Sequence, residues 1–117
     1  MNELATIMAT PTGGAVVVLV DGEVDMSNAA ELETTIRAHA TDASLVVLDL
    51  GAVSFFDSSG IRMLFSIRQE CRAQGVAIAL VAPEDSAVSH VLDVARVDDA
   101  APVFRTPEAA IAAMGAG

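Results

Sequence analysis

The stretch VVLDL at residues 46–50, followed after a short spacer by FFDSSGI at residues 55–61, decides the fold of this chain. β-Branched residues and leucine dominate the first part, which is typical of a strand buried on both faces. The second part joins Asp57, Ser58 and Ser59, and a short side-chain oxygen on any of them can cap a helix. The stretch predicts a buried strand, a tight turn and a helix start. Two hydroxyls then lie at the positive end of the helix dipole, where an added anion is tolerated.

A simple helix cap is the commoner meaning of such a motif when it stands alone. A reciprocal capping box is absent, because Ile61 and Arg62 occupy the positions where Glu or Gln would follow Ser58 or Ser59 by three residues. Gly60 has no Cβ and is expected to let another backbone approach closely. The motif alone therefore does not distinguish a simple helix cap from a turn with a function, and the rest of the chain is needed to choose between these two interpretations.

The composition describes a small acidic protein. Its 117 residues suffice for one domain with its own core, and we expect a single domain over 1–117. The formal net charge is −10, and all six basic residues are arginine. Such a surface repels phosphate backbones and anionic lipid, so neither nucleic-acid binding nor membrane binding is expected. The acidity favours either solubility or a basic partner protein, and it does not choose between them.

The expected compartment is the cytoplasm. No apolar run is long enough to cross a bilayer, and residues 1–5 lack the basic region of a secretory signal. The single cysteine, Cys71, excludes an internal disulfide framework and a cysteine-based zinc site. Its helical spacing from Leu64 and Ile67 predicts a small buried hydrophobe.

Strand and helix patterns alternate along the chain. A turn at residues 11–14 separates two N-terminal strands, and Gly22 marks a bulge or a close approach. Asn28 and Glu31 stand at capping-box spacing at the first helix start. The order ββαβαβαβα indicates an α/β fold whose mixed, mostly parallel sheet has an N-terminal β-hairpin at its edge. We expect strands over 3–10, 15–20, 45–50, 76–81 and 101–104, and helices over 27–40, 58–75, 84–94 and 107–114.

The helix that follows Asp57 is apolar on more than one side. We assign Leu64, Phe65 and Cys71 to the core. This assignment leaves Met63 and Ile67 for a neighbouring helix or for a partly exposed contact surface.

Enzyme motifs are not matched. A serine hydrolase needs Gly-x-Ser-x-Gly at the strand-to-helix turn, and residues 56–60 keep only its second glycine. The two histidines, His39 and His90, fall on predicted amphipathic helices, where a surface or packing role is commoner. A phosphate-binding loop would need a lysine, which the chain lacks, and the acidic residues at 21, 23 and 25 have no further metal ligands beside them. We therefore expect no enzyme, no cofactor and no metal site.

The layout and the motifs together resemble the anti-sigma factor antagonist family, small bacterial proteins of the STAS domain class. The resemblance lies in GEVD at residues 22–25, VLDL at 47–50 and FDSSGI at 56–61, and it covers nearly the whole chain. It implies a single STAS-like domain with helices mainly on one face of the sheet. The chain departs from the family at residues 26–28 and at Arg62, where small or apolar residues are common.

The resemblance also implies a function. In that family the serine directly after the aspartate, here Ser58, is phosphorylated by the cognate anti-sigma factor, which is a serine kinase. The unphosphorylated protein binds the anti-sigma factor and frees the sigma factor, and a metal-dependent serine phosphatase reverses the modification. Asp25 matches the family aspartate near the phosphorylation loop. The chain would act as a monomer or a weak homodimer.

A phosphate on Ser58 can break a complex only if the partner lies close to the same turn. An alternative function remains open, in which the chain is a STAS-type accessory subunit of a membrane transporter or stress-signalling complex and Ser58 is only a cap or contact residue. Besides Ser58, the predicted partner-binding residues are Asp25, Ser27, Asn28, Asp57, Ser59, Gly60, Met63 and Ile67.

Overall fold

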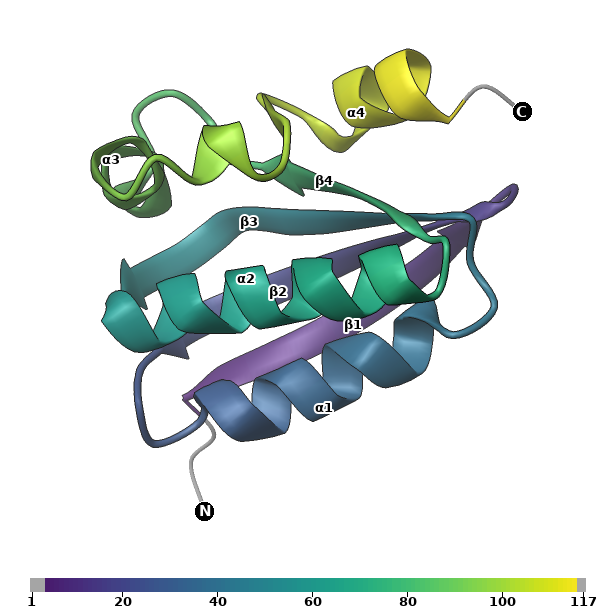
Figure 1. The fold of residues 1–117 in the computed structure, drawn as a ribbon. Coiled ribbons are helices and arrows are strands. Elements are labelled where there is room, and N and C mark those ends of the chain that lie inside the picture. Colours follow the sequence, from purple (N-terminus) through teal and green to yellow (C-terminus); the bar gives the residue numbers. More distant parts are fainter. Residues whose placement is uncertain (1–3, 116–117) are drawn as a thin grey trace.

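A computed structural model describes residues 4–115, which form one five-stranded sheet with helices on both of its faces (Figure 1). The strands lie across the sheet in chain order. The first pair is antiparallel and the other three pairs are parallel, so the predicted element order and mixed sheet are confirmed. The strands are β1 (Ala5–Thr12), β2 (Ala15–Val24), β3 (Leu45–Phe56), β4 (Ala77–Val81) and β5 (Val103–Phe104). The helices are α1 (Ala29–Ala40), α2 (Ser58–Ala73), α3 (Ala87–Val94), the short 3-10 helix η1 (Val97–Asp99) and α4 (Pro107–Met114).

The N-terminal hairpin has a shorter turn than predicted. Pro11 and Thr12 still pair with β2, so only Gly13 and Gly14 connect the two strands. Gly13 has a φ of 63°, which glycine adopts at no steric cost. Proline is tolerated at this point because β1 lies at the edge of the sheet.

The two faces of the sheet carry cores of different size. Val18 of β2 and Leu48 of β3 belong to the larger core, which α1, α2 and α3 cover with their apolar residues. On the reverse face, Val47 and Val81 pack with Ala110 of α4. Figure 1 shows α1 and α2 side by side along the sheet, with α4 beyond β4. Of the four α-helices within residues 4–115, three therefore lie on one face, as the family resemblance implied.

The strands β2 and β3 both run further than predicted, to Val24 and Phe56 instead of residues 20 and 50. Register shifts on both sides of Gly22 allow the pairing to continue, and this glycine has a φ of 125°. A Cβ there would collide with the carbonyl oxygen of Leu4, so the predicted bulge and close approach are confirmed. Val24 and Phe56 are the last residues that pair, and both strands therefore leave the sheet at neighbouring points.

The α2 helix presents a different face to the core from the one predicted. Met63 and Ile67 are 2% and 0% exposed, whereas Phe65 is 39% exposed. Leu64 and Cys71 are buried as expected. The buried positions follow i, i+3, i+4 spacing, which makes one continuous stripe, and Phe65 lies outside it. The assignment of Phe65 to the core was wrong, and so was the placement of Met63 and Ile67 on a surface.

Candidate functional site

Asp57 is the residue that caps α2. Its backbone is extended, and its side-chain Oδ1 accepts a hydrogen bond from the Ser59 amide at 2.8 Å. Ser58 is thus the first residue of the helix, and its side chain is exposed. No hydrogen bond within residues 4–115 engages the Ser58 hydroxyl. Because the cap is supplied by the aspartate, this hydroxyl is available to a reagent that approaches from solvent.

The first turn of α2 packs against an aromatic ring. A Cβ on Gly60 would come within 2.6 Å of the ring of Phe56, and both residues are buried. A close approach at this glycine is present, but the neighbour is the Phe56 side chain, so the prediction that another backbone approaches here was wrong. The contact fixes the end of β3 against the first turn of α2.

The loop between β2 and α1 is organised around Asp25. Its Oδ1 accepts hydrogen bonds from the Ser27 amide at 2.8 Å and from the Ser27 hydroxyl at 2.5 Å. The hydroxyl bond, followed by the bonds from the backbone, holds the pKa of the Asp25 carboxyl below its usual value. The loop therefore carries a stable negative charge beside the start of α2.

Asn28 ties the same loop back to the strand and does not form the predicted capping box. Its side-chain oxygen accepts from the Asp25 amide at 3.0 Å, and its side-chain nitrogen donates to the carbonyl of Glu23 at 2.8 Å. The side chain makes no capping bond to the helix, although Asn28 precedes the first residue of α1. These two bonds satisfy polar backbone groups at the end of β2. The Asn28 side chain makes them in place of a capping bond to α1.

The parallel register brings the two loops together. Val24 pairs with Phe56, and Asp25 and Asp57 are the next residues along each chain. The Ser54 hydroxyl adds a bond to the Gly22 carbonyl, 3.3 Å between the oxygens, close to this end. Of the predicted site residues, the structure gathers five at the surface of this end: Asp25, Ser27, Asn28, Asp57 and Ser58.

The other four predicted contact residues offer a partner little surface. Ser59 and Gly60 are buried within the first turn of α2. Met63 and Ile67 belong to the large core, so their predicted contact role is contradicted. A solvent-facing partner surface has to come from other side chains.

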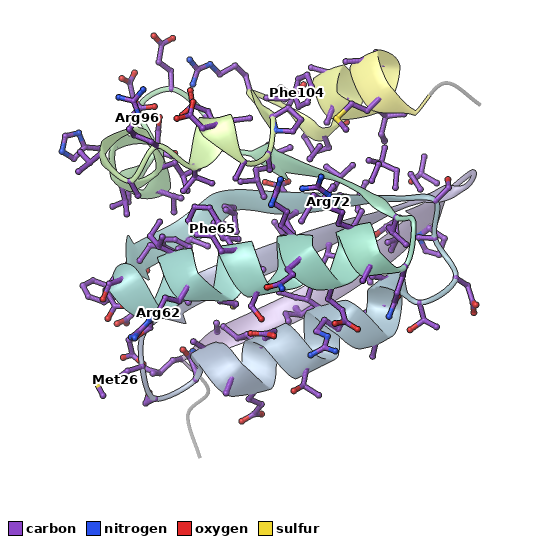
Figure 2. The ribbon with its side chains drawn as sticks, viewed as in Figure 1. Met26, Arg62, Phe65, Arg72, Arg96 and Phe104 are labelled. Carbon is purple, nitrogen blue, oxygen red and sulfur yellow. The ribbon has the colours of Figure 1, made fainter. Side chains whose placement is uncertain are left out.

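The sequence reasoning missed two exposed apolar side chains near the ends of β2 and β3. Met26 is 85% exposed in the loop after β2, and Phe55 is 48% exposed near the end of β3. Figure 2 shows Met26 and Arg62 at the same end of the molecule, where α2 begins. A signal for Phe55 was present, because strand alternation sends it to the face opposite the buried Phe56. For Met26 the signal was its place in an otherwise polar turn.

The described residues contain no group of three or more His, Cys, Asp and Glu side chains placed to hold a metal ion. No helix within residues 4–115 has both the length and the apolar character needed to span a membrane. Neither His39 nor His90 makes a described hydrogen bond to Ser58. What the arrangement offers chemically is an exposed serine hydroxyl at a helix N-terminus, directly after the Asp57 cap and at the same end of the sheet as the Asp25 loop.

The fold and this turn define a STAS domain. The family model of the STAS domain matches residues 6–110, and the chain belongs to that family. Over 102 residues it is 29% identical to the anti-sigma-F factor antagonist RsfA of Mycobacterium tuberculosis, a match that covers 85% of this chain and 79% of that protein. It is 38% identical over 68 residues to Osmosensory protein A of the same species. That second match covers 58% of this chain and only 43% of the relative's length.

Solved structures share the fold. An anti-sigma factor antagonist from Mycobacterium paratuberculosis superposes with a TM-score of 0.84 at 28% identity, covering 95% of this chain and 94% of that one. The antagonist SpoIIAA in its unphosphorylated form superposes with a TM-score of 0.73 at 19% identity, covering 96% of this chain and 99% of that one. The predicted STAS fold is confirmed by both likenesses.

Proposed function

We propose that this chain is an anti-sigma factor antagonist, a binding module whose unphosphorylated form binds an anti-sigma factor kinase and so releases a sigma factor. The observation that carries the proposal is the exposed hydroxyl of Ser58 at the first residue of α2, beside a cap that does not use it. The names of the antagonists with similar sequence and fold support it. Because its partners regulate transcription in bacteria, the chain acts in the cytoplasm.

The switch is the addition of a phosphate to Ser58. The kinase transfers the γ-phosphoryl group of ATP to the serine oxygen, which loses its proton, and ADP leaves. The product gains a charge of about −1.5 to −2 and three acceptor oxygens. The N-terminus of α2 tolerates this anion, because the helix dipole favours negative charge at the first turn, where Ser58 lies.

A bound partner tolerates the phosphate much less well. The new charge is added directly after the Asp57 cap, at the end of the sheet where the Asp25 loop also lies. A partner docked over this turn has to desolvate the phosphate or place its own groups against it. Binding is lost through local repulsion, with no large change in the shape of the chain.

The contact surface combines apolar anchors with an acidic rim. Met26 lies in the loop after β2 and Phe55 is the second-last residue of β3, and both are well exposed. Their apolar area suits the centre of an interface. The Asp25 carboxylate and the Asp57 cap form the rim, whose charge mainly sets the association rate with a basic partner surface.

The cycle needs two enzymes, and this chain supplies only their substrate. The anti-sigma factor is the serine kinase, and a metal-dependent serine phosphatase removes the phosphate. The exposed position of Ser58 supports access by both. The chain itself works without a cofactor or catalytic group.

A second candidate function is a regulatory subunit of a stress-signalling complex, in which Ser58 is a contact residue only. The 38% identity with Osmosensory protein A over 68 residues favours this class. The two candidates differ in one property, because only the first requires binding that depends on phosphorylation.

The test is a binding titration of the chain with a candidate anti-sigma kinase, run with unphosphorylated protein and with protein phosphorylated on Ser58. We expect tight binding by the first and a loss of at least about tenfold by the second, as expected for repulsion of a desolvated phosphate worth about 1.4 kcal/mol or more. Release of the sigma factor from a preformed complex is the second readout. Equal affinity for both forms would favour the regulatory-subunit function.

A further inference from the structure

Arg62 stands four residues after Ser58 on α2, and both side chains are exposed. Residues at this spacing lie on one face of a helix, with Cβ atoms about 5–6 Å apart. Long side chains in helices lean toward the N-terminus, so the side chain of Arg62 can reach the turn that carries Ser58. Ser66 continues the same stripe, and its hydroxyl donates to Glu33 of α1 at 2.7 Å. The stripe therefore runs along the solvent side of α2 next to α1.

The other arginines are engaged elsewhere or lie far along the chain. Arg37 pairs with Glu33 and Glu70, and Arg96 pairs with Asp99. Arg68 donates to the carbonyl of Ala100, and Arg105 donates to that of Ala82. Arg72 is exposed near the opposite end of α2.

Arg62 makes no ion pair with any residue from 4 to 115, and it is the arginine within one helical turn of Ser58. Three carboxylates belong to the segments that meet at this end of the sheet. Asp25 and Asp57 follow the paired ends of β2 and β3, and Glu31 lies in the first turn of α1.

We propose that Arg62 binds the phosphate of phosphorylated Ser58 within the same chain, as an ion pair across one turn of α2. The order is the favourable one for a helix, with the anion N-terminal to the cation. A phosphate and a guanidinium also match in geometry, because the planar group can donate two parallel hydrogen bonds. The inference rests on the proposed function for its biological setting.

The consequence is that phosphorylation changes two charges at the contact surface. It adds the phosphate, and it withdraws Arg62 from any contact with a partner. The pair also offsets part of the repulsion between the phosphate and the neighbouring carboxylates, which lets the modified turn stay folded. Arg62 acts here as a positioning residue for the phosphate.

The experiment uses protein that carries phosphoserine at position 58, installed during synthesis so that no kinase is needed. Phosphorus NMR then follows the second ionisation of the phosphate, which for a free phosphoserine has a pKa of about 6. A nearby cation favours the doubly charged form and lowers this pKa. We expect Arg62→Gln to raise it by about half a pH unit at low salt, as for unit charges near 6 Å in a mostly aqueous medium.

Two matched variants complete the test. Arg62→Lys keeps the charge, and we expect the pKa of its phosphoserine to stay nearer to that of the unsubstituted protein. Arg72→Gln removes an exposed cation from the far end of α2 and should leave the pKa unchanged. Identical pKa values in the unsubstituted protein and Arg62→Gln would overturn the inference.

This result is separate from that of the proposed function. Loss of the pKa shift would leave phosphorylation-dependent binding intact, because repulsion by the phosphate does not need Arg62. Conversely, a chain that binds no anti-sigma kinase would still show the shift if the ion pair forms.

Discussion

The ring of Phe56 lies so close to Gly60 that a Cβ on the glycine would come within 2.6 Å of it. This contact joins the last residue of β3 to the first turn of α2, across the cap formed by Asp57. It explains why the turn that presents Ser58 needs a glycine at position 60. The orientation of the helix start is thus set by packing as well as by capping.

Gly60→Ala is expected to destabilise the fold by about 1–3 kcal/mol, because the buried ring has little room to move. Chemical denaturation measures the loss. In a Phe56→Leu background the same glycine substitution should cost clearly less, since the ring that meets the new methyl group is gone. Equal costs in both backgrounds would show that the ring is not the cause.

Ser58→Ala should abolish phosphate incorporation by a cognate kinase while leaving the melting temperature within about a degree, since an exposed side chain outside the cap contributes little to stability. Mass spectrometry of the phosphorylated protein locates the group, and a thermal melt checks the fold. Ser59→Ala is the matched control. The Ser59 side chain is buried and should receive no phosphate, so this variant should still be phosphorylated. A phosphate found on Ser59 or Thr10 would contradict the assignment.

Met26→Asp and Met63→Asp are expected to act in opposite ways. Met26 is 85% exposed, so its substitution should weaken partner binding with little change in melting temperature. Met63 is 2% exposed, and an unpaired charge there should destabilise the fold by about 4 kcal/mol or more. Binding titrations and thermal melts on both variants separate the two effects.

Glu108→Lys is the control for the contact surface, since this residue lies in the first turn of α4 on the reverse side of the sheet. It reverses a charge without touching the turn around Ser58, and we expect neither binding nor stability to change appreciably. If it weakened binding as much as Met26→Asp, the partner would not be confined to the surface between the two loops.

The Asp25 carboxyl should titrate below its usual pKa of 3.8, chiefly because the Ser27 hydroxyl donates to the charged form. A pKa that is lower in the folded state means that the charged group stabilises the fold above the unfolded value. That contribution is lost as the pH falls through the folded value. NMR titration of the carboxyl carbon measures the pKa directly.

Ser27→Ala removes the hydroxyl donor and should move the pKa of Asp25 back toward 3.8. The stability difference between this variant and the unsubstituted protein should then shrink as the pH is lowered below that value. A pKa that does not move in Ser27→Ala would assign the effect to the backbone amides alone.

The order of the elements and the place of the functional turn could be predicted from the sequence alone. Alternating apolar strands and helices are local patterns, and so is the cap at Asp57, because each depends on residues within a few positions. The same holds for Thr106, which caps α4 with a bond to the Ala109 amide at 3.1 Å. The resemblance in the motifs added the STAS family, which the family model confirmed over residues 6–110.

Which side chains of those elements are exposed depends on how the elements pack together. The α2 helix is apolar on more than one side, and only its packing against the sheet and α1 buries Met63 and Ile67 and leaves Phe65 outside. Asn28 likewise bonds to Glu23 and Asp25 at the end of β2, although its local spacing favoured a capping box. Both outcomes depend on contacts between segments that only the folded chain brings together. Periodicity can predict that a helix has a buried side, but the neighbouring elements choose which side it is.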